Sequence, residues 1–78
     1  MEIPMTEILD VKGLNCPLPV LRTKKAMKAV PRGQVLTVEA TDPNTMRDIV
    51  ALCEASGFAL LSAQERDGVF VFEIRQAA

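Results

Sequence analysis

Residues 13–19 read GLNCPLP and place one cysteine, Cys16, between a glycine and two prolines. If a helix follows, its unpaired N–H groups and its macrodipole favour negative charge and lower the pKa of a nearby thiol. Pro17 and Pro19 each fix one backbone φ angle, so the turn that presents the thiol is stiff. These residues predict a nucleophilic thiol offered to another protein. The alternative is a small, half-buried apolar side chain beside a helix cap.

Most cysteine chemistries need partners that this chain lacks. It has two cysteines and no histidine, so the commonest general base and the commonest zinc ligand are absent, and two thiols alone make a poor metal site. Pro19 stands where a C-x-x-C pair would have its second cysteine, which argues against a dithiol oxidoreductase. Cys16 and Arg22 match the C-x5-R spacing of phosphatases, but the intervening PLPVL has no glycine to shape a phosphate loop.

A lone thiolate can still carry sulfur. It can attack a persulfide, hold the terminal sulfur as Cys-S-SH, and surrender that sulfur to another thiol by displacement. This exchange requires exposure, charge stabilisation and a docking surface, but no metal and no cofactor other than the transient cysteine persulfide. We therefore expect Cys16 to be the catalytic residue and expect no metal site.

Composition limits the number of domains, the binding partners and the compartment that we expect for this chain. The 78 residues are 49% hydrophobic and predict a single domain over residues 1–78. Nine basic and ten acidic residues, a pI near 5.3 and three phenylalanines as the only aromatic residues argue against nucleic-acid binding. The N-terminus MEIPMTEILDV does not resemble a signal peptide, and no apolar run reaches membrane-spanning length. We expect a cytoplasmic protein that binds no membrane, in which a Cys16–Cys53 disulfide is not favoured.

The elements that position the thiol follow from apolar spacing and turn residues. We expect strands over about residues 8–11, 34–40, 58–66 and 69–75, and a first helix from residue 17 to about residue 30. A second helix should begin after an N-cap at Asp42, with Pro43 at its first position, and end near Gly57. Asp67-Gly68 is a strong hairpin signal between the last two strands. The order β-α-β-α-β-β predicts an α/β two-layer sandwich. Its four-stranded mixed sheet would have a parallel first pair, an antiparallel final hairpin and both helices on one face.

The second predicted helix has an apolar stripe that includes the other cysteine. Met46, Ile49, Val50 and Cys53 fall at i, i+3, i+4 and i+7. This spacing predicts that Cys53 is a buried structural thiol.

The first predicted helix separates an apolar side from a basic one. Val20, Thr23, Met27 and Val30 share the side expected to pack on the sheet, whereas Leu21 falls among Arg22, Lys24, Lys25 and Lys28. An apolar residue ringed by cations near the cysteine is typical of a docking patch for an acidic partner surface. A solvated helix face with one stray leucine explains the pattern equally well. Arg47 and Asp48 are either partner contacts or exposed salt-bridging residues, and the sequence favours the latter.

The segment LDVKGLNCPLPVLRTKKAM, followed by DPNTMRDI and a cysteine at position 53, resembles the TusA/SirA family of small sulfur-carrier proteins. The resemblance runs from about Leu9 to Arg75. Its core, L-D-x-x-G-L-x-C-P-x-P, fixes a strand, a turn, the cysteine and both prolines at set spacings. The DP-x-T-x-R-D-I segment is a second, independent match.

The resemblance implies a two-layer α/β sandwich that carries a persulfide on Cys16, with Gly13, Pro17 and Pro19 as supporting motif residues. It also implies a cysteine desulfurase or a rhodanese-like protein as sulfur donor, and a downstream sulfur-acceptor protein. The relay would lead to tRNA thiolation, molybdenum-cofactor synthesis or sulfur oxidation. The residues that match the family's partner-contacting positions are Leu21, Lys24 and Lys28. Asp42 and Arg47 match the family's acidic and basic pair near the start of the second helix, although a capping role explains Asp42 equally well, and we also expect Arg47 to bind the partner. Leu18 departs from the acidic residue that the best-known tRNA-thiolation members have there, so no single pathway is assigned.

Two other functions compete with the sulfur carrier. The first is a non-catalytic redox- or sulfur-responsive adaptor in which Cys16 is a switch. The second is an RNA-binding domain, which only fold-level analogy supports and which the acidic pI opposes. No long apolar face remains after the helices and the sheet pack in the predicted fold, so we expect a monomer.

Overall fold

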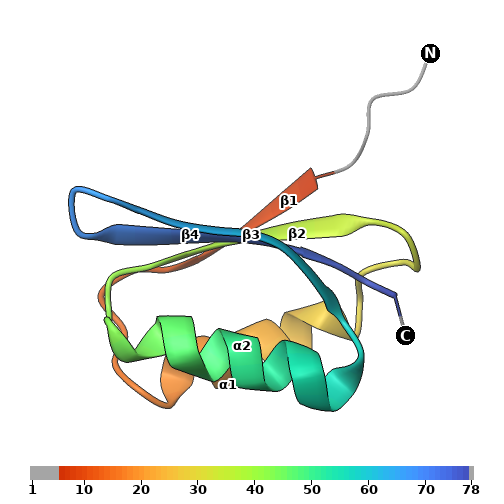
Figure 1. Ribbon diagram of the computed structural model, residues 1–78, viewed down its shortest axis with the longest axis horizontal. Helices are drawn as coiled ribbons and strands as arrows, with labels where there is room; N and C mark the ends of the chain where they lie inside the picture. The colour runs from red at the N-terminus through yellow and green to blue at the C-terminus, as the bar shows by residue number, and fades with distance from the viewer. Residues whose placement is uncertain (1–5, 78) are drawn as a thin grey trace.

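The computed structural model describes residues 6–77 and has the predicted order of elements. They are β1 (Thr6–Val11), α1 (Leu18–Met27), β2 (Val35–Ala40), α2 (Asn44–Ser56), β3 (Ala59–Arg66) and β4 (Val69–Arg75). Figure 1 shows both helices beneath one face of the sheet, which confirms the α/β two-layer sandwich. The expected domain over residues 1–78 extends past the described residues at both ends.

The sheet has the order β1-β2-β4-β3 and mixes parallel with antiparallel pairs. β1 runs parallel to β2, with Leu9 opposite Val38, and β2 runs antiparallel to β4, with Val38 opposite Phe72. β3 and β4 form the expected antiparallel hairpin, whose turn residues Asp67 and Gly68 both have positive φ, 53° and 83°. Because the parallel pair places the ends of β1 and β2 together, the loops that follow these strands share one end of the molecule (Figure 1).

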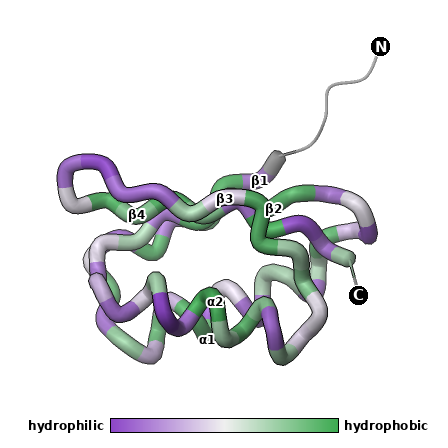
Figure 2. Tube along the Cα trace, viewed as in Figure 1, coloured by the Kyte–Doolittle hydropathy of each residue, from purple (hydrophilic) through white to green (hydrophobic). Residues whose placement is uncertain are grey.

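The core lies between the sheet and the helices. Along β2, Leu36, Val38 and Ala40 are buried, whereas the alternate positions are half-buried on the other side of the sheet. The buried apolar residues of the described chain are Val11, Met27, Leu36, Val38, Ala40, Ile49, Leu52, Cys53, Phe72 and Ile74. Figure 2 shows hydrophobic residues along both the strands and the two helices.

Helix α1 is shorter than expected at both ends. It begins at Leu18, with Pro17 at the N-cap position, and it ends at Met27 although we expected about Val30. The N–H groups of Lys28, Ala29 and Val30 donate to carbonyls three residues earlier, so the chain tightens after Met27. The predicted packing side is confirmed, because Thr23 and Met27 are buried and both Val20 and Val30 pack partly against the core.

Helix α2 buries a different stripe from the one that we predicted. Its buried residues are Thr45, Ile49, Leu52 and Cys53, whereas Met46 is half-buried and Val50 is 37% exposed. The burial of Cys53 is confirmed, but the inclusion of Val50 is wrong. The buried positions i, i+4, i+7 and i+8 form an equally helical stripe, and the presence of the polar Thr45 within it hid that stripe from an apolar pattern.

Two buried threonines differ in whether their hydroxyl has a partner. Thr23 Oγ1 donates to the Pro19 carbonyl at 2.8 Å, whereas Thr45 Oγ1 has no hydrogen-bond partner within residues 6–77. Both side chains are almost fully buried, with exposed fractions of 0% and 2%. Burying an unpaired hydroxyl costs about 1–3 kcal/mol, whereas a made hydrogen bond contributes about 1 kcal/mol.

The near-isosteric substitutions Thr45→Val and Thr23→Val should therefore change stability in opposite directions. Thr45→Val should raise the free energy of unfolding by about 1 kcal/mol, because it removes an unpaired buried hydroxyl. Thr23→Val should lower this free energy by a similar amount. Urea denaturation measures both. A loss of stability in Thr45→Val equal to that in Thr23→Val would contradict this account of the Thr45 hydroxyl.

Candidate functional site

Cys16 lies in the loop between β1 and α1, exposed, directly before the cis Cys16–Pro17 peptide bond. The start of α2 lies at the same end of the molecule (Figure 1). The site is therefore assembled from two segments that are far apart in the sequence, the loop that carries the cysteine and the beginning of α2.

Two hydrogen bonds fasten the cysteine loop to the segment before α2. The Gly13 N–H donates to Thr41 Oγ1 at 2.9 Å, and the Cys16 N–H donates to Asp42 Oδ2 at 2.6 Å. The second bond is short, as is typical of a bond to a charged acceptor. These contacts fix the backbone that presents the thiol.

Asp42 has a larger role than the expected N-cap. The assigned helix begins at Asn44, but Pro43 before it already has helical dihedrals, φ −58° and ψ −26°, so the expected capping role of Asp42 is confirmed. The Asp42 carboxylate accepts the Asn44 N–H at 3.1 Å through Oδ1, while Oδ2 accepts the Cys16 N–H. One side chain thus supports the first turn of α2 and the cysteine loop together.

Gly13 and the two motif prolines shape the loop. Gly13 has a φ of +84°, and a Cβ placed on it would meet no atom within 4 Å. The requirement for glycine is therefore conformational, since a side chain has room but this φ disfavours one. Pro17 stands at the N-cap position of α1, and Pro19 is buried in its first turn.

The environment of the thiol overturns the expectation of a lowered pKa. The Cys16 thiol donates a hydrogen bond to Asp48 Oδ2 at 3.3 Å. This bond raises the pKa of Cys16, and desolvation and the negative charges of Asp48 and Asp42 raise it further, whereas the positive charge of Arg47 lowers it. These contacts therefore favour the protonated thiol over the thiolate.

The start of α1 has few N–H groups left to stabilise a thiolate. Pro17 and Pro19 have no N–H, and the Leu18 N–H already donates to the Asn15 carbonyl at 2.9 Å. The Cys16 N–H is bound to Asp42. The prolines that stiffen the turn thus also remove the donors that would lower the pKa of the thiol.

Asp48 differs from the exposed salt-bridging residue that we expected at this position, whereas Arg47 is exposed as expected. Asp48 is half-buried and accepts the thiol hydrogen bond, so the expectation is wrong for Asp48. Arg47 is exposed, and its charge acts on the thiol. Sequence patterns did not identify Asp48 as a partner of Cys16. The sequence held only an indirect signal for this pair. Parallel pairing of the first two strands places the loop that follows each strand at the same end of the sheet, so the Cys16 loop and the start of α2 come close together.

The basic side of α1 faces solvent as expected. Leu21 is 53% exposed, and Leu18 beside it is 43% exposed. The cations of this helix, Arg22, Lys24, Lys25 and Lys28, are all exposed. The apolar residues and the cations thus share an accessible surface next to the cysteine loop.

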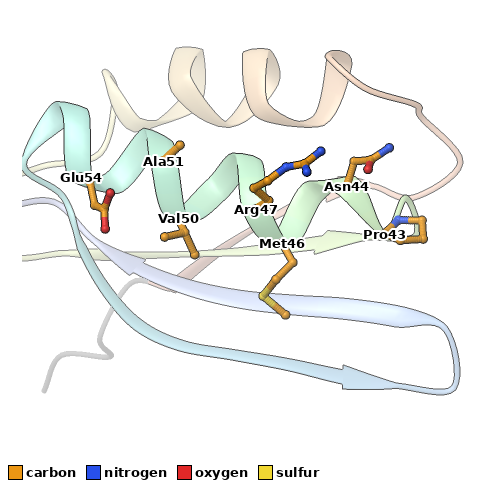
Figure 3. Close-up of a pocket in the computed structure, with 7 residues that line it drawn as sticks. All are labelled: Pro43, Asn44, Met46, Arg47, Val50, Ala51 and Glu54. Atoms are coloured by element: carbon orange, nitrogen blue, oxygen red, sulfur yellow. The ribbon is translucent and has the colours of Figure 1, made fainter.

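A shallow groove runs along the outer side of α2. It is lined by Pro43, Asn44, Met46, Arg47, Val50, Ala51 and Glu54. In Figure 3, Met46 points toward the β3–β4 hairpin, whereas Arg47 and Asn44 point toward the side of α1. Arg47 therefore joins this groove to the charged surroundings of Cys16.

Cys53 does not take part in the site. Its side chain is 5% exposed within the core, and burial raises its pKa. Both cysteines are free thiols. Across residues 6–77, no group of three or more histidine, cysteine, aspartate or glutamate residues could hold a metal ion. No helix in the described part of the chain is long and apolar enough to cross a membrane.

Comparison with known proteins places this arrangement in a family. Residues 7–76 match the family model described as sulfurtransferase TusA. A putative sulfur carrier protein of Neisseria meningitidis is 50% identical over 70 residues, which cover 90% of this chain and 95% of that protein. The sulfur carrier protein TusA of Allochromatium vinosum is 46% identical over 69 residues, covering 88% and 91% of the two chains.

The fold gives the same result. The crystal structure of a SirA-like protein from Desulfitobacterium hafniense superimposes with a TM-score of 0.81 and 29% identity, covering 95% of this chain and 100% of that one. The sequence and structural matches both span nearly the whole chain. The chain therefore belongs to the TusA family of sulfur carrier proteins.

Proposed function

We propose that the chain accepts sulfane sulfur as a persulfide on Cys16 and transfers it to an acceptor protein in a sulfur relay. The observation that carries this proposal is the exposed Cys16 thiol on a hydrogen-bonded loop, in a chain of the sulfur carrier family. Cys53 is too buried to meet a partner protein. Cys16 is thus the thiol that a donor enzyme can reach.

Loading is a displacement at sulfur. The Cys16 sulfur forms a bond to the terminal sulfur of a donor persulfide, and the sulfur–sulfur bond of the donor breaks. The bonding electrons leave with the donor thiolate, so no external oxidant or reductant is required. Unloading repeats the step with Cys16 as the leaving thiolate and an acceptor thiol as the attacking group.

The proposed docking surface consists of Leu21, Lys24, Lys28 and Arg47. Its exposed leucine supplies apolar contact area, and its cations suit an acidic rim on the partner. The donor class is a cysteine desulfurase or a rhodanese-like protein, and the acceptor serves tRNA thiolation, molybdenum-cofactor synthesis or sulfur oxidation. Both partners act in the cytoplasm in this proposal.

One observation favours the alternative of a non-catalytic adaptor. The raised pKa of Cys16 keeps the thiol protonated and slows its attack on an electrophile. A switch that responds only to a strong oxidant would have this property. In that function the chain binds its partner but passes on no sulfur.

Sulfide release separates the carrier from the adaptor. The chain is incubated with a cysteine desulfurase and cysteine, purified from both, and then treated with dithiothreitol. A carrier releases sulfide in an amount stoichiometric with the chain, because the reductant cleaves the persulfide. Release at the level of a sample without desulfurase, repeated with a rhodanese and thiosulfate, would favour the adaptor.

The same assay examines the docking surface. Lys24→Glu combined with Lys28→Glu should slow loading by the desulfurase, because the reversed charges repel an acidic partner. Alkylation of Cys16 by iodoacetamide should stay unchanged, since the reagent is neutral and needs no docking. Arg22→Glu combined with Lys25→Glu is the matched control, because it reverses the same number of exposed charges on the same helix outside the proposed docking surface. Equal loading rates for all three proteins would remove these lysines from the donor interface.

A further inference from the structure

We propose that Asp48 is a catalytic residue of the sulfur transfer, which takes the proton of the Cys16 thiol during attack and returns it to the leaving thiolate of the donor. This inference rests on the proposed function as a persulfide carrier. It adds a proton acceptor to the displacement that the Cys16 thiol carries out.

The geometry supports direct transfer between the two side chains. Asp48 Oδ2 lies 3.3 Å from Cys16 Sγ, within the range for a hydrogen bond to sulfur. Asp48 is half-buried in the second turn of α2, so the helix and its packing hold the carboxylate in place. The Cys16 backbone is held by Asp42, just before the same helix. Both reacting side chains are thus positioned from one segment.

The charged groups around the thiol leave Asp48 as the available acceptor. Those that act on it are Asp48, Asp42 and Arg47, all from α2 or the loop before it, and the cations of α1 lie beyond its first turn. The Asp42 carboxylate already accepts two backbone N–H groups. Arg47 is a cation and cannot accept a proton. The chain also has no histidine to serve as a base.

A protonated thiol makes such an acceptor necessary. The pKa of Cys16 is raised above its ordinary value, because its thiol donates to Asp48 and lies near two negative charges, so the protonated thiol is favoured. The hydrogen bond to a carboxylate aligns the S–H bond with an acceptor before the donor arrives. The same carboxylate that raises the resting pKa can therefore remove the proton when the sulfur–sulfur bond forms.

The proton balance closes within the complex. As Cys16 Sγ bonds to the terminal sulfur of the donor persulfide, the thiol proton moves to Asp48 and the sulfur–sulfur bond of the donor breaks. Asp48 then protonates the departing donor thiolate and returns to its anionic form. The products are the Cys16 persulfide and a donor thiol, with no proton taken from solvent.

The variant Asp48→Asn separates proton transfer from a purely electrostatic effect. Removing the charge should lower the pKa of Cys16, so alkylation by iodoacetamide at neutral pH should become faster than in the parent chain. Loading by a cysteine desulfurase should instead become slower, by about tenfold to a hundredfold, because the proton acceptor is lost. Loading of the variant should also rise with pH until Cys16 ionises, whereas loading of the parent chain should depend less on pH.

Two further variants and a folding check sharpen the comparison. Asp48→Glu retains a carboxylate and should recover part of the loading rate. Glu54→Gln removes an exposed carboxylate further along α2 and should change neither rate. Urea denaturation of each variant shows whether it is folded.

The outcomes separate this proposal from the function on which it rests. Faster loading together with faster alkylation in Asp48→Asn would overturn the proposal, since Asp48 would then only suppress reactivity. Unchanged rates in both assays would overturn it as well. If the parent chain takes up no sulfur from either donor class, the carrier function itself fails, and the alkylation rates still report whether Asp48 controls the thiol.

Discussion

Replacing Cys16 by serine is expected to abolish sulfur loading, whereas Cys53→Ala should load like the parent chain. A serine hydroxyl cannot form the sulfur–sulfur bond of a persulfide, and Cys53 is buried in the core, away from any donor. Cys16 is exposed, so its replacement should change the free energy of unfolding by less than about 0.5 kcal/mol. The loss of loading would then be chemical and not structural.

The measurement is the amount of sulfur bound to each variant after incubation with labelled cysteine and a desulfurase. Alanine at position 53 avoids a buried hydroxyl, although the lost sulfur leaves a small cavity that should lower stability. Circular dichroism confirms that both variants are folded. If Cys16→Ser binds as much sulfur as the parent chain, Cys16 does not carry the sulfur. The same conclusion follows if folded Cys53→Ala binds none.

Phe72→Ala should have the largest effect on stability. Phe72 is fully buried on β4, opposite Val38 of β2 and Ala63 of β3, at the centre of the core. Replacing a buried phenylalanine by alanine costs about 3–5 kcal/mol from lost burial and the cavity that remains. Small domains have total stabilities of about 5–15 kcal/mol, so this one change removes a large share of the total.

Urea denaturation should show a much lower midpoint for Phe72→Ala than for Leu61→Ala. Leu61 is 46% exposed at the irregularity between β3 and β4, so its truncation should cost far less. If both substitutions lower the free energy of unfolding by the same amount, Phe72 does not lie at the centre of the core. Folded Phe72→Ala should still load sulfur on Cys16, since the thiol lies outside the core.

The order of elements was predictable because its signals are local. Alternating β-branched residues, the prolines near the helix starts and the Asp67-Gly68 turn each act within a few residues of the chain. The boundaries were less predictable. At the C-terminal end of α1, residues 28–30 take a tighter turn before Pro31, which the apolar spacing of Val30 does not reveal.

The buried face of α2 and the pKa shift of the Cys16 thiol could not be predicted without the tertiary structure. Thr45 is polar in sequence yet buried in the fold, so an apolar pattern selected Val50 in its place. The prediction for Cys16 considered only the helix that follows it. The structure brings Asp42 and Asp48 to the thiol from a segment about thirty residues away, where the hydrogen bond to Asp48 and the two negative charges raise the pKa of Cys16.

The resting site therefore combines accessibility with low reactivity. Asp42 holds the backbone of the cysteine loop, and Asp48 accepts a hydrogen bond from the protonated Cys16 thiol. In the proposed mechanism, reaction begins when a docked donor places its persulfide within reach of Cys16. Low reactivity before docking would limit loss of the thiol to small electrophiles, since the thiolate is the reactive form.

The most direct test of the central claim is mass spectrometry of the parent chain after incubation with a cysteine desulfurase and cysteine, followed by proteolysis without reductant. Our account predicts a mass gain of one sulfur atom on the peptide that contains Cys16, removed by dithiothreitol, and no gain on the peptide that contains Cys53. A sulfur on the Cys53 peptide, or no gain with either a desulfurase or a rhodanese as donor, would contradict the proposal that Cys16 carries a persulfide.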